Sequence, residues 1–152
     1  MQRYTVIIFF SWVLVFFSSC KKDQCTKDGA NYSSIVGAWE LRQVQAGMIP
    51  AIDYSPGNGS ILKFSNSMYE KYTNNSLVAS GQYILIEDTS VEAEVGLVIP
   101  SGQFTRRIIY DNDFSSRKTF IQASDNKLTF LSGYFPLDGG SNVLYQRIGN
   151  NR

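Results

Sequence analysis

The chain has 152 residues, enough for one domain, and its formal net charge at pH 7 is +1. With 14 basic and 13 acidic side chains, it lacks the strongly basic surface that nucleic-acid binding requires. It contains no histidine, which excludes a Ser-His-Asp or Cys-His catalytic arrangement and a zinc site with imidazole ligands. We therefore expect a small neutral protein that is not an enzyme and needs no metal or cofactor.

The first 19 residues have the layout of a secretory signal. Arg3 supplies a positive charge, residues 5–17 form an apolar run interrupted only by Ser11, and two serines follow. A charged start, an apolar middle and a small-residue cleavage site are the three parts of such a signal. The run is too short for a membrane-spanning helix, which needs roughly 20 apolar residues. We therefore expect residues 1–19 to be a cleaved signal peptide.

Cys20 follows the two serines directly. A cysteine in this position resembles a bacterial lipobox. The resemblance implies cleavage before Cys20 and acylation of its thiol, by palmitate or a similar chain, and of the new amino terminus. Several acyl chains hold a protein firmly on a membrane, at about 0.8 kcal/mol per buried methylene. The protein would then be lipid-anchored in the bacterial cell envelope. The alternative is ordinary signal cleavage in which Cys20 has no role.

Residues 20–34 are interpreted as the lipidated cysteine and a flexible tether. The stretch after Cys20 is polar and shows no apolar period. Within it, Lys22 and Asp23 resemble the short charged export signal of surface lipoproteins in Bacteroidota. That resemblance indicates the outer membrane and leaves open which face the protein occupies. Cys25 has no partner within the chain once Cys20 is acylated, so we interpret it as part of the tether.

From Ile35 to about residue 150, short apolar segments alternate with turns rich in Gly, Asn, Asp, Ser and Pro. Short β-branched and aromatic runs at this spacing predict an all-β sandwich or barrel formed by one domain. No segment shows helical periodicity beyond one or two turns, and no internal repeat is present. The expected strands are residues 35–45, 60–64, 68–72, 77–86, 91–99, 104–110, 119–123, 127–131 and 143–148.

Residues 119–123 and 127–131 form the clearest hairpin, because only three turn residues separate them. Side chains alternate between the two faces of a strand. This alternation places Ile121 and Ala123 on one face, opposite Leu128 and Phe130.

The domain opens with a Gly-x-Trp sequence at Gly37 and Trp39, and it closes with Tyr-Gln-Arg-Ile at residues 145–148. The opening resembles the first strand of lipocalins and related calycins. The ending resembles the small lipocalin-like lipoproteins of Bacteroidota. The resemblance covers residues 35–148 and implies a single antiparallel up-and-down β-barrel of about eight strands.

The resemblance implies that Trp39 closes one end of the barrel and that Gly37 allows the backbone to pack closely there. Arg147 would lie over the indole ring, a contact worth about 0.5–2 kcal/mol. Arg42 is the alternative cation. The Thr-Asp-Tyr type motif that lipocalins carry in a later loop is absent, so ligand binding does not follow from the resemblance alone.

An eight-stranded barrel is either filled by its own side chains or holds one small ligand. If it holds a ligand, aromatic side chains would line an apolar pocket and phenol hydroxyls would orient the ligand. We therefore expect either a non-catalytic barrel that binds a small apolar or amphiphilic molecule, or a filled barrel that docks an envelope protein through its loops. The candidate pocket residues are Phe64, Tyr69, Tyr72, Tyr83, Phe104, Phe130 and Tyr145.

Acidic pairs offer little further chemistry. Glu92 and Glu94 alternate along an expected strand, and we interpret them as solvated side chains. Asp111 and Asp113 lack the following Gly and distal Glu of a calcium-binding loop.

Overall fold

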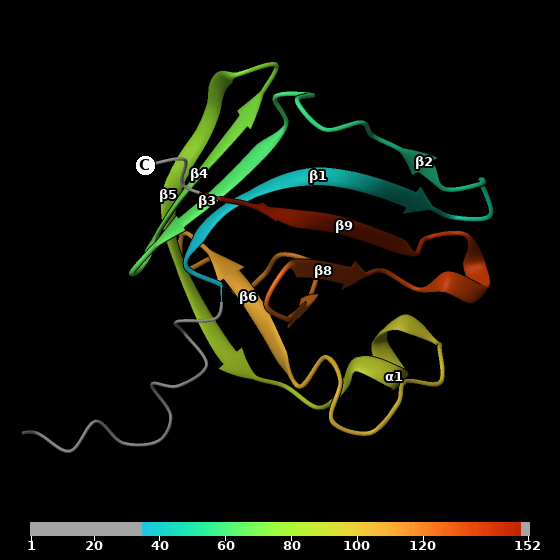
Figure 1. Ribbon diagram of the computed structural model, residues 1–152. Helices are drawn as coiled ribbons and strands as arrows, with labels where there is room; N and C mark the ends of the chain where they lie inside the picture. Colours follow the sequence, from blue (N-terminus) through green and yellow to red (C-terminus); the bar gives the residue numbers. More distant parts are fainter. Residues whose placement is uncertain (1–34, 150–152) are drawn as a thin grey trace, which may run out of the picture.

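Eight antiparallel strands close into a barrel (Figure 1). The computed structural model describes residues 35–149, so the predictions for the signal peptide, Cys20 and the tether lie outside the described residues. Strand β1 (Gly37–Ala46) pairs with β3 (Ile61–Ser65) on one side and with β9 (Ser141–Ile148) on the other, which closes the ring. This confirms the predicted all-β, up-and-down antiparallel barrel of lipocalin-like architecture.

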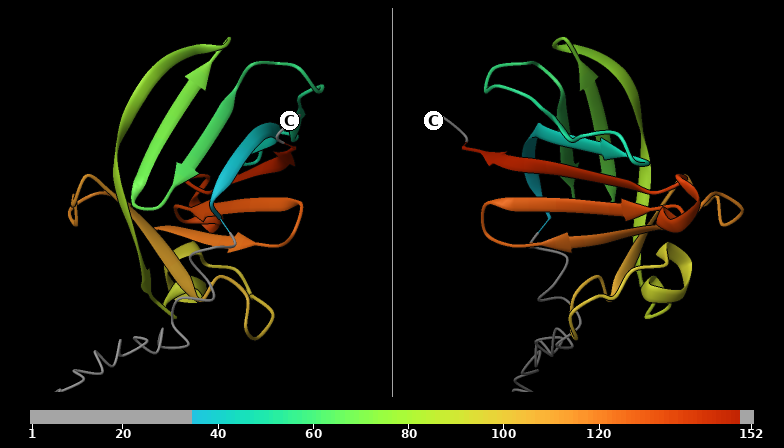
Figure 2. Two further views of the ribbon diagram at one scale, coloured as in Figure 1. Left: turned by 60° about the vertical axis from the view of Figure 1, so that its left-hand side comes forward. Right: turned by 90° about the vertical axis from the view of Figure 1, so that its right-hand side faces the viewer.

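Each remaining strand of the ring pairs with its neighbours in the sequence. These strands are β4 (Met68–Thr73), β5 (Ser76–Glu87), β6 (Arg106–Tyr110), β7 (Thr119–Ala123) and β8 (Lys127–Ser132). A further two-residue strand, β2 (Ile52–Asp53), pairs with the second half of β1 and takes no part in the ring. Figure 2 shows β3, β4 and β5 (green) on one side of the barrel and β7 to β9 (orange to red) on the other.

The prediction of a strand at residues 91–99 is wrong. This segment forms the short helix α1 (Val91–Val95) and a loop. Val91 and Val95 lie four residues apart, so one turn of helix places both on the same buried face. Gly96 then adopts the left-handed conformation and ends the helix. A 3-10 turn, η2 (Phe135–Leu137), lies between β8 and β9.

A small apolar cluster lies outside the barrel and attaches α1 to it. The cluster contains both buried valines of α1 together with Phe104, Phe120 and Leu131. Phe120 and Leu131 are cross-strand partners on β7 and β8, so they share the outer face of the sheet. Phe104 belongs to this outer cluster, and its predicted place in the pocket is therefore corrected.

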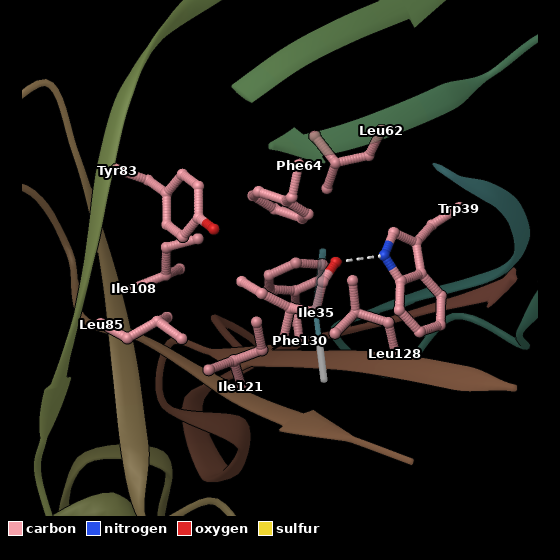
Figure 3. Close-up of a cluster of buried hydrophobic side chains, with 10 residues drawn as sticks. All are labelled: Ile35, Trp39, Leu62, Phe64, Tyr83, Leu85, Ile108, Ile121, Leu128 and Phe130. Carbon is pink, nitrogen blue, oxygen red and sulfur yellow. Dashed lines mark hydrogen bonds between the residues drawn. The ribbon is translucent and has the colours of Figure 1, made fainter. Parts of the chain in front are cut away.

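The main core lies inside the barrel, where side chains from several strands point toward one another (Figure 3). Its side chains come from every strand of the ring except β4 and β9, whose Tyr69, Val143 and Tyr145 pack against it partly buried. The predicted hairpin is confirmed, because Ile121 pairs with Phe130 and Ala123 pairs with Leu128. The buried residues of this core are Ile35, Trp39, Leu62, Phe64, Tyr83, Leu85, Ile108, Ile121, Leu128 and Phe130.

Trp39 closes the end of the barrel at which the described chain begins. It is fully buried, and its indole N–H donates a hydrogen bond of 2.7 Å to the carbonyl oxygen of Ile35 (Figure 3). The guanidinium of Arg147 lies 4.0 Å from the centroid of the indole ring. Arg147 also donates to the carbonyl oxygens of Val36 and Asp125, at 2.8 Å each. The cation over Trp39 is thus Arg147, whereas Arg42 pairs with Glu40.

Gly37 is needed for this arrangement. Its φ of +136° is a conformation that other residues rarely adopt, and a Cβ atom added there would lie 2.6 Å from Nη1 of Arg147. The glycine therefore lets the arginine pass across β1 to the tryptophan. We call this end, formed by residues 35–37 and the turns at 66–67 and 124–126, the closed end.

We expect Trp39→Ala to lower the free energy of unfolding by about 3–5 kcal/mol, because the change leaves a large cavity in the core. Urea denaturation of the barrel measures the loss. Phe114→Ala is the matched control, since Phe114 is 59% exposed and its truncation should cost less than about 0.5 kcal/mol. A loss below about 1 kcal/mol for Trp39→Ala would show that the closed end does not depend on the indole.

Candidate functional site

The half of the barrel away from Trp39 contains a cavity of about 360 Å³. It opens toward the loops at residues 47–60, 74–75, 111–118 and 133–140, which form what we call the open end. Most of its lining is apolar or aromatic, and one charged side chain takes part. The residues that line it are Leu62, Tyr69, Lys71, Ala79, Tyr110, Thr119, Phe130, Val143 and Tyr145.

Strand register explains which side chains of β4 face the cavity. Directly paired residues share a face of the sheet. Tyr69 pairs with Phe64, and Lys71 pairs with Leu62, and both partners belong to the barrel core. Tyr69 and Lys71 therefore point inward, and the residue between them points out.

Tyr69 is held in place by Asp111, which follows the last residue of β6. The Tyr69 hydroxyl donates a hydrogen bond of 2.9 Å to one oxygen of Asp111, and the other oxygen accepts the backbone N–H of Gln82, also at 2.9 Å. Asp111 lies where a side chain on Gly81 would stand, since an added Cβ would overlap its carboxylate. Burial and the Asp111 carboxylate raise the pKa of Tyr69, so its phenol stays neutral.

Two other phenol hydroxyls in the cavity lining have no hydrogen-bond partner within residues 35–149. They belong to Tyr110 and Tyr145. Burial, together with the neighbouring tyrosines, raises the pKa of Tyr110, and burial raises that of Tyr145. The rings are fixed by edge-on contacts, Tyr110 against Tyr69 at 4.6 Å and Tyr145 against Phe130 at 5.7 Å between centroids. The cavity lining thus includes two tyrosines, held by ring contacts, whose hydroxyls make no hydrogen bond within residues 35–149.

Among residues 35–149, Lys71 is the one charged residue that lines the cavity. In the described part of the chain, its ammonium group makes no ion pair or hydrogen bond. The side chain is exposed, which fits a lysine whose apolar stem follows the wall while its charge stays near water. The mouth of the cavity therefore carries an unpaired positive charge.

The structure divides the predicted pocket residues into three groups. Tyr69, Phe130 and Tyr145 line the cavity. Phe64 and Tyr83 are buried in the core at an edge-on ring distance of 4.8 Å, and they leave no space between them for a ligand. The last group, Tyr72 and Phe104, lies outside the barrel.

The prediction for Tyr72 is corrected by the alternation along β4. It stands three residues from Tyr69 and therefore on the opposite face. It pairs with Ile61 and stacks under the ammonium of Lys63, which lies 4.5 Å from its ring centroid on the outer surface. Lys71 lies two residues after Tyr69 and therefore shares its inner face, but the sequence analysis did not predict it.

Tyr110 was missed for a related reason. Its spacing from the buried Ile108 on β6 puts both on the inner face, but no motif draws attention to it. Thr119 and Val143 line the cavity because Thr119 begins β7 and Val143 is the third residue of β9, so both lie near the open end. Only the closed ring brings these strand ends together.

Within residues 35–149, no group of three or more His, Cys, Asp or Glu side chains is placed to hold a metal ion. No helix among the same residues has the length and apolar character needed to cross a membrane. Comparisons of the chain with protein-family models, with curated proteins and with solved structures gave no match. The function is therefore inferred from the cavity and from the sequence motifs.

We expect the barrel to lose stability as the pH rises above 10, in part through Tyr110. Its ordinary pKa is 10.0 and folding raises it, so the folded state retains the proton more tightly than the unfolded chain does. The stabilisation is complete below pH 10 and is lost as the pH rises toward the folded pKa. Urea denaturation at several pH values between about 8 and 11 should show a shallower decline for Tyr110→Phe than for the original chain. Equal slopes would contradict the burial of this phenol.

Proposed function

We propose that this protein is a lipid-anchored binding protein of the bacterial cell envelope, whose barrel holds one small apolar or amphiphilic molecule without a chemical step. The observation that carries the proposal is the cavity between the aromatic core and the open end. The anchor, through Cys20, and the relationship to lipocalin-like lipoproteins of Bacteroidota rest on the sequence motifs. Within this proposal the outer membrane is the site of anchoring.

The cavity has the character of a ligand site. Its volume of about 360 Å³ lies near the lower limit of the usual range for such pockets, roughly 300–1,000 Å³. Apolar side chains form most of its wall, and the hydroxyls of Tyr110 and Tyr145 are placed within it. A few polar groups in an apolar pocket set the orientation of a ligand, while burial of its apolar surface supplies most of the affinity.

The position of the anchor is compatible with ligand entry. The described chain begins at Ile35, at the closed end, and β1 leads from there to the open end. A tether from Cys20 would therefore join the barrel at the end opposite the mouth. The mouth stays clear of the attachment point, so a ligand can reach it from solution or from another surface.

A docking module is the second candidate, and a specific observation favours it. The open-end loops expose large apolar side chains, with Met48 at 84%, Leu137 at 80% and Ile49 at 64% exposure. Exposed apolar groups gathered around one site often mark a protein interface. In this alternative an envelope protein covers the open end, and the cavity is incidental.

We expect Ala79→Trp to abolish binding of apolar probes while the barrel stays folded. Ala79 faces the cavity from β5, opposite Lys71, so an indole at this position fills the space from the wall. Ser80→Trp is the matched control, because Ser80 is the next residue on the same strand, is exposed and pairs with Glu70 on the outer face. Binding of a fluorescent fatty-acid analogue, measured on residues 26–152, reports the result.

The two candidates give different outcomes in this experiment and in native mass spectrometry of the same chain purified from its host. A bound small molecule that is present with Ser80→Trp and lost with Ala79→Trp supports the binding protein. Equal probe binding by both variants, or repeated absence of a small molecule together with recovery of a protein partner, would reject it.

We expect Cys20→Ala to release the protein from membranes, because the acylated thiol is then missing. Fractionation of cells that produce the full chain, followed by detection of the protein in the soluble and membrane fractions, measures the effect. Cys25→Ala is the control and should leave the protein on the membrane. Retention of the Cys20→Ala variant in the membrane fraction would argue against the lipobox.

A further inference from the structure

The first half of β5 lacks a neighbouring strand on one of its two sides. β5 begins at Ser76, but its pairing with β6 begins only at Tyr83, which stands opposite the last residue of β6, Tyr110. Figure 1 shows the hairpin of β4 and β5 extending past the end of β6. Among residues 35–149, β4 is therefore the one strand beside residues 76–81, which we call the free edge. The edge of a sheet presents unpaired backbone N–H and C=O groups to which another strand can bond.

The backbone of Gln82 shows which groups point to this edge. Its N–H donates to the Asp111 carboxylate at 2.9 Å, and its carbonyl oxygen accepts the backbone N–H of Asp111 at 2.8 Å. Because the direction of these groups alternates along an antiparallel strand, Ser80 directs its N–H and C=O to the same side. In the described part of the chain no hydrogen bond satisfies them there. A further strand would supply both the donor and the acceptor at this spacing.

The free edge is uncharged and partly apolar. It contains no charged residue and no proline, two of the means by which proteins keep an exposed edge from pairing. Leu77 and Val78 are instead 55% and 56% exposed. Leu77 pairs with Tyr72, and Tyr72 pairs with Ile61, so an apolar row crosses the outer surface from β3 to the free edge. An apolar row that ends at an unpaired edge is typical of a surface that another polypeptide covers.

We propose that the free edge pairs with the free edge of a second copy of this chain, so that two barrels share one antiparallel ladder across a two-fold axis. An uncharged run suits self-pairing, because the two-fold axis brings each residue close to its own kind and no like charges meet. The antiparallel direction also keeps the two Asp111 carboxylates at opposite ends of the ladder. The apolar rows of the two copies then lie on one continuous outer surface, and Leu77 and Val78 lose contact with water. This inference goes beyond the proposed function and does not depend on a ligand.

Sedimentation equilibrium on residues 26–152 tests the pairing. These residues contain the complete ring of strands and no cysteine, so a disulfide cannot contribute to association. We expect a monomer–dimer equilibrium between micromolar and millimolar concentration. Ser80→Pro should weaken the dimer at least about tenfold, since it removes an N–H that the monomer does not use and the pair loses one bond from each copy. Met48→Ser, which removes an exposed apolar side chain from an open-end loop, is the control and should change nothing.

Charges introduced at the same position test whether the partner is a second copy. Ser80→Lys and Ser80→Glu each place like charges on both sides of the two-fold axis, so each variant alone should self-associate several-fold more weakly. An equal mixture of the two should regain the original affinity to within about twofold, because opposite charges then face each other. Ser65→Lys and Ser65→Glu are the matched controls, since Ser65 is exposed on β3 at the closed end. They should have no effect, alone or mixed.

Each other outcome would reject self-pairing. A chain that stays monomeric at millimolar concentration contradicts it, and so does a dimer that neither Ser80→Pro nor the charged variants weaken. A monomer that recovers a different protein from its host, and loses it with Ser80→Pro, would assign the free edge to that protein instead. Urea denaturation shows which variants are folded, and if Ser80→Pro is not, the Ser80→Lys and Ser80→Glu mixture decides. Ligand binding in the cavity is measured separately with Ala79→Trp, so either proposal can fail without the other.

Discussion

The closure of one end of the barrel by Trp39 and Arg147 determines much of the remaining structure. The arginine contacts the indole ring and bonds to the carbonyl oxygens of Val36 and Asp125. It thereby connects β9 to the start of β1 and to the turn between β7 and β8. An eight-stranded barrel has room for its own side chains or for one small ligand, and here the core packs beside this closure while the larger apolar cavity lies toward the open end.

Two separate apolar clusters stabilise the domain. The main core stabilises the ring from inside, whereas the outer cluster attaches the long connection between β5 and β6 to the outside of β7 and β8. Ion pairs support that attachment, since Asp88 lies 3.2 Å from Arg107 and 3.3 Å from Lys118. The connection is therefore held on the outer face of β7 and β8.

The groups that line the cavity are suited to binding a molecule. Binding requires only shape, apolar surface and a few fixed polar groups. The tyrosine rings supply rigid surface, and the hydroxyls of Tyr110 and Tyr145 supply donors. Lys71 adds a charge at the mouth.

The amino-acid sequence by itself predicted an all-β domain and most of its strands, whereas the barrel and its closure by Trp39 were expected only from the resemblance to lipocalins. Alternation along each strand and turn residues between strands are local signals, and they were sufficient to place Ile121 opposite Phe130. Residues 91–99 were wrongly predicted to be a strand. Two valines four residues apart share one face in a single turn of helix as well as in a strand, so the pattern does not distinguish the two.

Only the tertiary structure decided which inward side chains fill the core and which line a cavity. Phe64 and Tyr83 alternate along their strands in the same way as Tyr69 and Tyr145, yet the first two pack against each other and the others face free space. That difference depends on height along the barrel axis, which is set by the closure between β1 and β9 and by the register of every pair between them. Such distances join residues far apart in the chain, so no local pattern contains them.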